Sequence, residues 1–169
     1  SHQGTMIVAA KDLPKQDNVI TGISGRKGFT IINIEKDMMN AEIGFARRVL
    51  SVLEEENISF EHMPSGIDTL SIVIRDEHIV GKMQKVISKI NGITNADNID
   101  IHSGLSLIAT VGHNMASRQG TAAKIFEALA SKNINVRMID QGSSELNIIV
   151  GVDTFDYEKA ICSIYDAFN

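Results

Sequence analysis

The sequence predicts an α+β fold made of two copies of one β-α-β-β-α-β unit, each an antiparallel sheet with helices on one face. The main observation is an internal repeat with an offset of 76 residues, as in 115 − 39. Five anchor pairs carry it: Met39 and Met115, Gly44 and Gly120, Asn57 and Asn133, Gly66 and Gly142, and Leu70 and Leu146. Each copy also alternates β-branched stretches with stretches of helical periodicity, which is the second observation.

The first unit is expected to contain six elements in the order of the ferredoxin-like fold. The β-branched run at 29–34 predicts a strand, and apolar residues at helical spacing predict a helix over 41–56. A hairpin turning at Pro64-Ser65-Gly66, a second helix and a closing strand follow, over residues 58–63, 69–74, 79–90 and 99–101. The sequence therefore predicts one complete βαββαβ unit over residues 29–103.

The second unit repeats this order but lacks a counterpart for the closing strand. Its expected elements span residues 105–111, 118–132, 135–138, 146–152 and 155–167. Residues 18–23 read as a strand that has no place in the first unit, and an open sheet edge is a hazard that proteins avoid. We therefore expect this strand to intertwine the units: residues 1–17 form a connector, 29–103 the first unit, and 18–27 plus 104–169 the second.

Composition excludes several classes of protein. The 169 residues include 16 Lys and Arg and 21 Asp and Glu, a net charge of −5, and no Trp, which disfavours a nucleic-acid partner. No apolar run approaches the roughly 20 residues of a membrane span. The single Cys162 cannot form an internal disulfide. We expect a cytoplasmic protein with no membrane partner.

Motifs for catalysis are absent from the sequence. Gly22, Gly25 and Gly28 do not have the spacing of a dinucleotide-binding fingerprint, and there is no phosphate-binding P-loop. The five histidines have no metal-ligand spacing and are interpreted as surface or strand-end residues: His2, His62, His78, His102 and His113. The sequence therefore predicts no catalytic residue, no metal site and no cofactor in this chain.

Two groups of residues are candidates for binding a ligand. The loop over residues 37–44 leads into a helix whose first amides and positive dipole end suit a carboxylate, although Met39 could equally be core and Gly44 a packing position. Ser59, Phe60 and Glu61, with Ser65 and Asp68 near them, would place acidic groups to meet an ammonium, although a strand glutamate is often only solvated. Together the two groups predict a site for an α-amino acid.

Several longer motifs resemble the tandem ACT domains that form the C-terminal regulatory half of aspartokinases. The resemblance covers residues 19–169. In the first unit it is carried by Met39-x4-Gly44-Phe45 and by the stretch ISFEHMPSGID at 58–68. In the second unit it is carried by VGHNM at 111–115 and by QGSSELN at 141–147.

The resemblance implies allosteric feedback rather than chemistry by this chain. Aspartokinases phosphorylate aspartate with ATP, the first step towards lysine, threonine and methionine, and their ACT pairs bind lysine or threonine and lower the activity. The chain would then carry no catalysis itself, residues 1–17 would connect to a kinase domain, and ATP and Mg would belong to that domain. The ACT units would also form a homodimer.

Residue by residue, the family's effector pocket falls on positions of both candidate groups. They are Met39, Asn40, Ala41, Glu42, Gly44, Ser59, Phe60, Glu61, Ser65 and Asp68, with Glu61 matched to the lysine ε-ammonium. Lysine-binding relatives often carry His-Ser where this chain has Ala41-Glu42. In the second unit, residues matched to packing between ACT units, or to a second effector, are Asn114, Met115, Asn135, Gln141, Ser143, Ser144 and Glu145.

Three other functions stay open on the sequence alone. An ACT-type amino-acid sensor of another metabolic enzyme would share the fold and the ligand class. A small ferredoxin-like enzyme would require titratable residues converging in a closed pocket. A nucleic-acid module is disfavoured by the negative net charge.

Overall fold

The computed structural model describes residues 19–169. The expected connector over residues 1–17 lies outside the described residues. The strands, α-helices and 3-10 turns (η) follow one another in the order β1 (Gly22–Glu35), η2 (Met39–Ala41), α1 (Phe45–Glu55), β2 (Thr69–Arg75), α2 (Asp76–Ile79), α3 (Met83–Thr94), β3 (Asn98–Val111), η3 (His113–Met115), α4 (Thr121–Ser131), β4 (Val136–Asp140), β5 (Asn147–Asp153), η4 (Thr154–Asp156) and α5 (Tyr157–Phe168).

All five strands belong to one antiparallel sheet in the order β2-β1-β3-β5-β4. The first half of β1, residues 22–27, pairs with residues 106–111 of β3, beside β5 in the second unit. The second half of β1 pairs with β2 and with the start of β3 in the first unit. The expected α+β fold, intertwined by the N-terminal strand, is therefore confirmed. The two expected sheets are one continuous sheet, because β1 and β3 each fuse two predicted strands.

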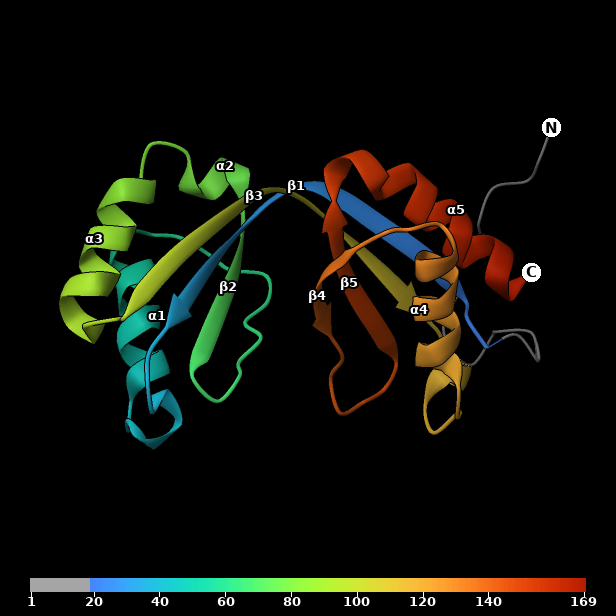
Figure 1. The fold of residues 1–169 in the computed structure, drawn as a ribbon, viewed down its shortest axis with the longest axis horizontal. Helices are drawn as coiled ribbons and strands as arrows, with labels where there is room; N and C mark the ends of the chain where they lie inside the picture. The colour runs from blue at the N-terminus through green and yellow to red at the C-terminus, as the bar shows by residue number, and fades with distance from the viewer. Residues whose placement is uncertain (1–18) are drawn as a thin grey trace.

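Both long strands bend where they pass from one unit to the other (Figure 1), and each has a glycine with a left-handed φ in this region. Gly28 has φ 88° and Gly104 has φ 75°, left-handed values that glycine adopts without a Cβ clash. The β1–β3 register shifts between Lys27 and Phe29, as expected at a β-bulge. Since 104 − 28 is again 76, the repeat places one bend in each strand.

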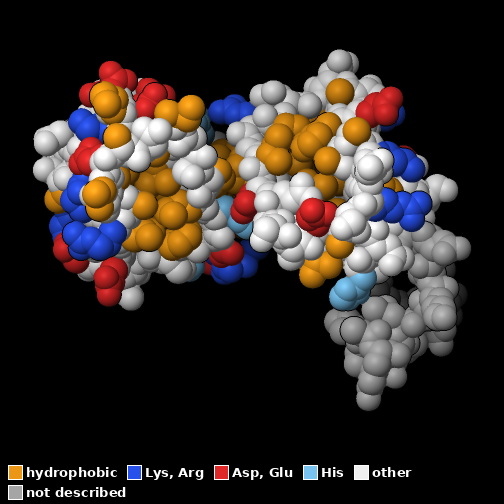
Figure 2. All heavy atoms as spheres, turned by 90° about the horizontal axis from the view of Figure 1, so that it is seen from below, with side chains coloured by type: hydrophobic (Ala, Val, Ile, Leu, Met, Phe, Trp, Pro, Cys, Tyr) orange, Lys and Arg blue, Asp and Glu red, His pale blue; other side chains and the backbone are white. Residues whose placement is uncertain are grey.

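Three hydrophobic clusters hold the sheet and helices together. Helices α1 and α3 cover the first unit and α4 and α5 the second, each over its own core (Figure 1). A third cluster joins residues of both units: Phe29, Ile31, Val73, Leu105, Leu107 and Met138. In the view from below, hydrophobic side chains gather on each unit and charged and histidine side chains lie between the units (Figure 2).

The repeat is not free of gaps. Asn57 and Asn133 keep the offset of 76, and both adopt left-handed φ values after their helices, 53° and 54°. Strands β2 and β5 have identical burial patterns but begin at Thr69 and Asn147, an offset of 147 − 69 = 78. The expected match of Leu70 with Leu146 is therefore wrong: Leu70 corresponds to Ile148, because the turn before β5 is two residues longer.

The expected strand over residues 58–63 is also wrong. The segment forms no continuous strand: two isolated bridges, His62 to Val73 and Ser65 to Leu70, and a few backbone hydrogen bonds join it to β2. Pro64 lies between these bridges and has no N–H to donate to a ladder. In the first helix, the left-handed φ of 79° at Gly44 delays the start from the expected residue 41 to Phe45.

The carboxylate of Glu56, at the C-terminal end of α1, is almost fully buried. The Glu56 side chain is 7% exposed and accepts hydrogen bonds from Lys89 Nζ at 2.7 Å and Lys85 Nζ at 2.9 Å. These two bonds hold the pKa of Glu56 below its usual value of 4.5. The interaction therefore ties the end of α1 to α3.

We predict that replacing Gly104 by alanine destabilises the fold by about 1–2 kcal/mol, the cost of a left-handed L-residue. A Cβ at Gly104 would meet no atom within 4 Å, so the cost is purely conformational. Gly92→Ala is the matched control: it too meets no atom, but it lies in α3, where alanine adds about 0.5–1 kcal/mol of stability. Urea unfolding of the wild type and both variants measures these changes in the free energy of unfolding. Equal effects of the two substitutions would contradict the role of the bend.

We predict that stability falls as pH drops through the lowered pKa of Glu56. A group whose pKa is depressed in the folded state stabilises the fold above its unfolded pKa and loses that contribution below the folded one. The loss should appear below about pH 4.5 and be smaller in Glu56→Gln. Denaturation midpoints at about pH 6 and pH 3 test it. Glu54→Gln, an exposed glutamate of the same helix, should keep the wild-type dependence.

Candidate functional site

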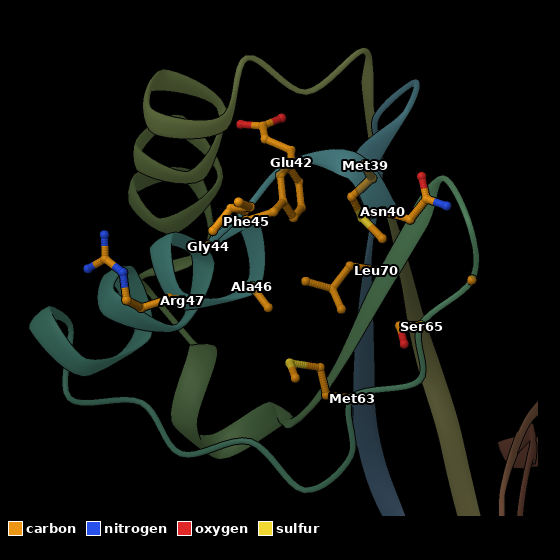
Figure 3. Close-up of a pocket in the computed structure, with 12 residues that line it drawn as sticks. Met39, Asn40, Glu42, Gly44, Phe45, Ala46, Arg47, Met63, Ser65 and Leu70 are labelled. Atoms are coloured by element: carbon orange, nitrogen blue, oxygen red, sulfur yellow. The ribbon is translucent and has the colours of Figure 1, made fainter.

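A pocket of about 470 Å³ opens beside the first turn of α1 (Figure 3). Its walls come from η2, the start of α1, the segment before β2 and β2 itself. Ala46, Met63 and Leu70 point into the space between α1 and β2. Twelve residues line it: Met39, Asn40, Glu42, Ile43, Gly44, Phe45, Ala46, Arg47, Met63, Ser65, Gly66 and Leu70. We call it the loop pocket.

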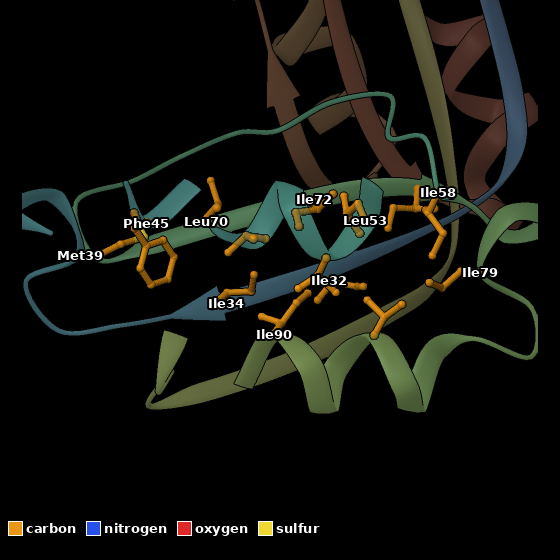
Figure 4. Close-up of a cluster of buried hydrophobic side chains, with 14 residues drawn as sticks. Ile32, Ile34, Met39, Phe45, Leu53, Ile58, Leu70, Ile72, Ile79 and Ile90 are labelled. Atoms are coloured by element: carbon orange, nitrogen blue, oxygen red, sulfur yellow. The ribbon is translucent and has the colours of Figure 1, made fainter. Parts of the chain in front are cut away.

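The floor of the loop pocket is the end of the first unit's core. Met39, Phe45 and Leu70 are 8%, 4% and 2% exposed and belong to the cluster shown in Figure 4. An aliphatic part of a ligand would therefore rest on side chains that the fold already holds in place.

The loop before α1 is held by backbone contacts. Met38 and Gly44 both adopt left-handed φ values, 57° and 79°, around the single turn η2. Asn40 N donates to Ile67 O at 3.2 Å, which ties η2 to the turn before β2. Gly44 is the N-cap of α1 and supplies no side-chain cap bond. Phe45 N donates to Glu42 O at 3.3 Å. The other first-turn amides of α1 have no side-chain acceptor and belong to residues of the pocket wall, at the positive end of the helix dipole.

The acidic group of the loop pocket is paired. The Glu42 carboxylate accepts a hydrogen bond from Arg48 Nη2, and Arg48 Nη1 also donates to Ile43 O at 3.4 Å. A ligand carboxylate would thus meet amide dipoles rather than an uncompensated acid.

The structure brings together half of the ten predicted first-unit residues. Met39, Asn40, Glu42, Gly44 and Ser65 line the loop pocket. Ala41 and Asp68 use backbone groups to hold its walls: Ala41 N donates to Met38 O at 3.0 Å, and Asp68 O accepts from Lys36 N at 2.9 Å.

The remaining three predicted residues lie outside the loop pocket. Ser59 and Phe60 line a groove near the other end of α1, and Ser59 Oγ hydrogen-bonds His78 Nδ1 at 3.0 Å. Glu61 accepts a hydrogen bond from Arg75 Nε at 2.5 Å, and this bond raises the pKa of Arg75. The arrangement separates the proposed ammonium partner from the loop amides.

Sequence reasoning missed several residues of this region. Phe45 and Ala46 directly follow Gly44, so locating the helix start correctly would have placed them at the wall. Arg75 ends β2, which lies antiparallel to residues 61–65, so strand pairing would have brought it to Glu61. Met63 and Leu70 carry only an apolar pattern, which does not distinguish a pocket floor from a closed core.

The corresponding loop of the second unit is closed by its own glutamate. Glu145 Oε2 accepts a hydrogen bond from Ser117 N at 2.6 Å, and both residues have left-handed φ values, 55° and 59°. Met115 is buried, whereas the other candidates of this unit are on the surface: Asn114, Asn135, Gln141, Ser143, Ser144 and Glu145.

Within residues 19–169, no three His, Cys, Asp or Glu side chains are grouped so as to hold a metal ion. No helix in this part of the chain is long and apolar enough to cross a membrane.

The comparisons with known proteins agree on one class. An ACT domain family model matches residues 108–168. Aspartokinase 3 of Bacillus subtilis is 37% identical over 99% of this chain and 37% of its own length. The crystal structure of Clostridium acetobutylicum aspartate kinase has a TM-score of 0.88 and 55% identity, over 94% of this chain and 37% of that one. E. coli aspartokinase III in complex with lysine and aspartate (T-state) has a TM-score of 0.76 over 93% of this chain and 35% of that one; its 18% identity shows the fold alone.

The fold and these matches define a pair of ACT domains. The chain spans 37% of the length of the Bacillus subtilis enzyme and 37% of that of the Clostridium acetobutylicum enzyme. Within the class, it belongs to the tandem ACT regions of aspartokinases.

We predict that Glu145→Gln loosens the second unit's loop. A hydrogen bond to a charged group contributes roughly 1.5–3 kcal/mol, so protection of the Ser117 amide from hydrogen exchange should fall by about tenfold or more. Amide exchange followed by NMR measures this. Glu127→Gln, an exposed glutamate on α4, should leave Ser117 unchanged. Unaltered protection in Glu145→Gln would show that this bond does not hold the loop.

Proposed function

We propose that the chain is the regulatory region of a cytoplasmic aspartokinase, and that it binds an end-product amino acid, lysine and/or threonine, to inhibit aspartate phosphorylation. Membership of the aspartokinase ACT family supports this, as does the lysine held by E. coli aspartokinase III. ATP, Mg and aspartate would be handled by a catalytic part of the same enzyme.

The observation that carries the proposal is the loop pocket, because it combines amide donors with an apolar floor. The first-turn amides of α1 suit the carboxylate of an amino acid, and Asn40 and Ser65 supply polar groups at the rim. Met63 and Leu70 suit an aliphatic side chain. The volume of about 470 Å³ lies in the ordinary range for small-ligand sites.

Lysine needs an acceptor for its ε-ammonium, and Glu61 is the proposed one. Arg75 now holds this carboxylate at 2.5 Å, and both side chains are about one third exposed, 31% and 32%. An ammonium entering there would share or replace the guanidinium. Threonine has no side-chain ammonium and needs no such acceptor. Dependence of binding on Glu61 therefore distinguishes the two effectors.

A second copy of the chain is the proposed partner. Three large apolar residues around the loop pocket are exposed to water: Ile43 at 97%, Met38 at 72% and Ile67 at 70%. A twofold homodimer that covers them would close the pocket over its ligand. An effector that binds one arrangement of the dimer better than another shifts the equilibrium between them, typically by ~1–3 kcal/mol.

We predict that calorimetric titration of the chain with lysine, threonine, methionine and aspartate gives binding for lysine or threonine. Ala46→Leu, which extends into the loop pocket, should weaken that binding by about tenfold or more, since overfilling a packed site costs about 1–3 kcal/mol. Ala122→Leu, 76 residues further along, is the matched control and should bind normally.

Glu61→Gln gives the second arm of this experiment. Glu61→Gln should weaken the binding of lysine and leave the binding of threonine unchanged. If neither amino acid binds at millimolar concentration, or if Ala46→Leu and Ala122→Leu behave alike, the proposed function is wrong.

A further inference from the structure

A second cavity lies between the two units, away from the loop pocket. Its volume is about 240 Å³, and its walls come from strands of both units. The polar residues that line it are Asn33, Ser71, His102 and Arg137, and Ile31 and Met138 belong to the apolar cluster between the units. We call it the inter-unit cavity.

The donors of the inter-unit cavity suit an anion. The guanidinium of Arg137 has five N–H donors, and its ion pair with Asp153 uses only Nη1, at the long distance of 3.5 Å. Its side chain is 32% exposed, so the charge is partly shielded from water. The imidazole of His102 is a second polar group at the wall. A planar fork of this kind matches the two oxygens of a carboxylate.

The opposite wall is already arranged by internal hydrogen bonds. Ser71 Oγ donates to Asn33 Oδ1 at 2.9 Å, and Asn33 Nδ2 donates to Glu35 Oε1 at 3.2 Å. These bonds fix the polar groups of β1 and β2, while Ile31 and Met138 offer an apolar surface. A ligand with one charged end and a short hydrocarbon chain fits a cavity with polar groups on one part of its wall and an apolar surface on another.

A hydrogen bond joins the two units near the cavity. His62 Nδ1 lies 2.6 Å from Asp140 Oδ2, which joins the segment before β2 to β4. Pro64 and Ile139, close to these two residues in sequence, both line the cavity. The shape of the cavity therefore depends on how the two units sit against each other.

We propose that the inter-unit cavity binds a small aliphatic carboxylate, with Arg137 holding the carboxylate and Ile31 and Met138 contacting the hydrocarbon. Because both units supply walls, the bound ligand stabilises the arrangement in which His62 contacts Asp140. This site differs from the loop pocket in its residues and in its ligand: it needs no ammonium group.

The test is NMR titration of the ¹⁵N-labelled chain with butyrate, butyramide and inorganic phosphate. Butyrate should shift the amides of His62 and of residues 137–140 and saturate, whereas the uncharged butyramide should not. Arg137→Gln should weaken butyrate binding at least tenfold, and Arg137→Lys should weaken it less. Asp153→Asn should strengthen butyrate binding, because it releases the guanidinium of Arg137. Arg47→Gln, at the loop pocket, is the control and should bind butyrate normally.

Three outcomes would overturn the proposal: butyrate binding that survives Arg137→Gln, equal binding of butyramide, and phosphate binding as tightly as butyrate. Folding of each variant is checked by its amide spectrum, and Arg137→Lys keeps the test valid if Arg137→Gln unfolds. Lysine titration of Arg137→Gln separates the two sites. If Arg137→Gln binds lysine normally but no longer binds butyrate, this proposal is supported. If the wild-type chain binds butyrate but not lysine, only the proposed function is contradicted.

Discussion

The pairing of β1 with β3 is the contact on which the rest of the structure depends. Both strands are 14 residues long, and each takes part in both units. The first half of β1 covers the edge of β3 that the second unit would otherwise expose, and Ile23 packs against that unit's core. The sheet of the second unit is incomplete without this half of β1, and both β1 and β3 continue into the first unit. The chain therefore forms one cooperative body rather than two independent domains joined by a linker.

This arrangement explains how ligand binding in one unit can reach the other. Among residues 19–169, two strands cross between the units, and each bends at a glycine. The cluster of Phe29, Leu105 and Met138, together with the His62–Asp140 bond, holds the inner faces in contact. A packed core deforms in discrete steps rather than continuously, because its side chains interlock. A small change beside α1 would then be transmitted as a change in how the units sit together.

Much of the fold was predictable from local pattern, and its failures have physical causes. The donated strand followed from counting elements in two similar copies, and the left-handed Asn57 and Asn133 preserved the offset. The strand at 58–63 failed because Pro64 removes a ladder donor, which hydrophobic alternation does not register. The loop-pocket residues near Gly44 were predictable because a helix N-terminus is a local feature. The Glu61–Arg75 pair was within reach too, because the expected hairpin places residues 58–63 beside β2. The inter-unit cavity was not, because it depends on how the two units pack.

The two units also differ in a way that the repeat conceals. In the first, Gly44 begins α1 beside an open pocket without a side-chain cap, and the turn before β2 is short. In the second, the turn is two residues longer, and its Glu145 reaches the amide of Ser117. A side-chain carboxylate thus satisfies an amide of this loop, and the loop is held by its own chain. The same backbone plan therefore gives one unit an open loop beside a pocket and the other a loop that is closed by its own chain.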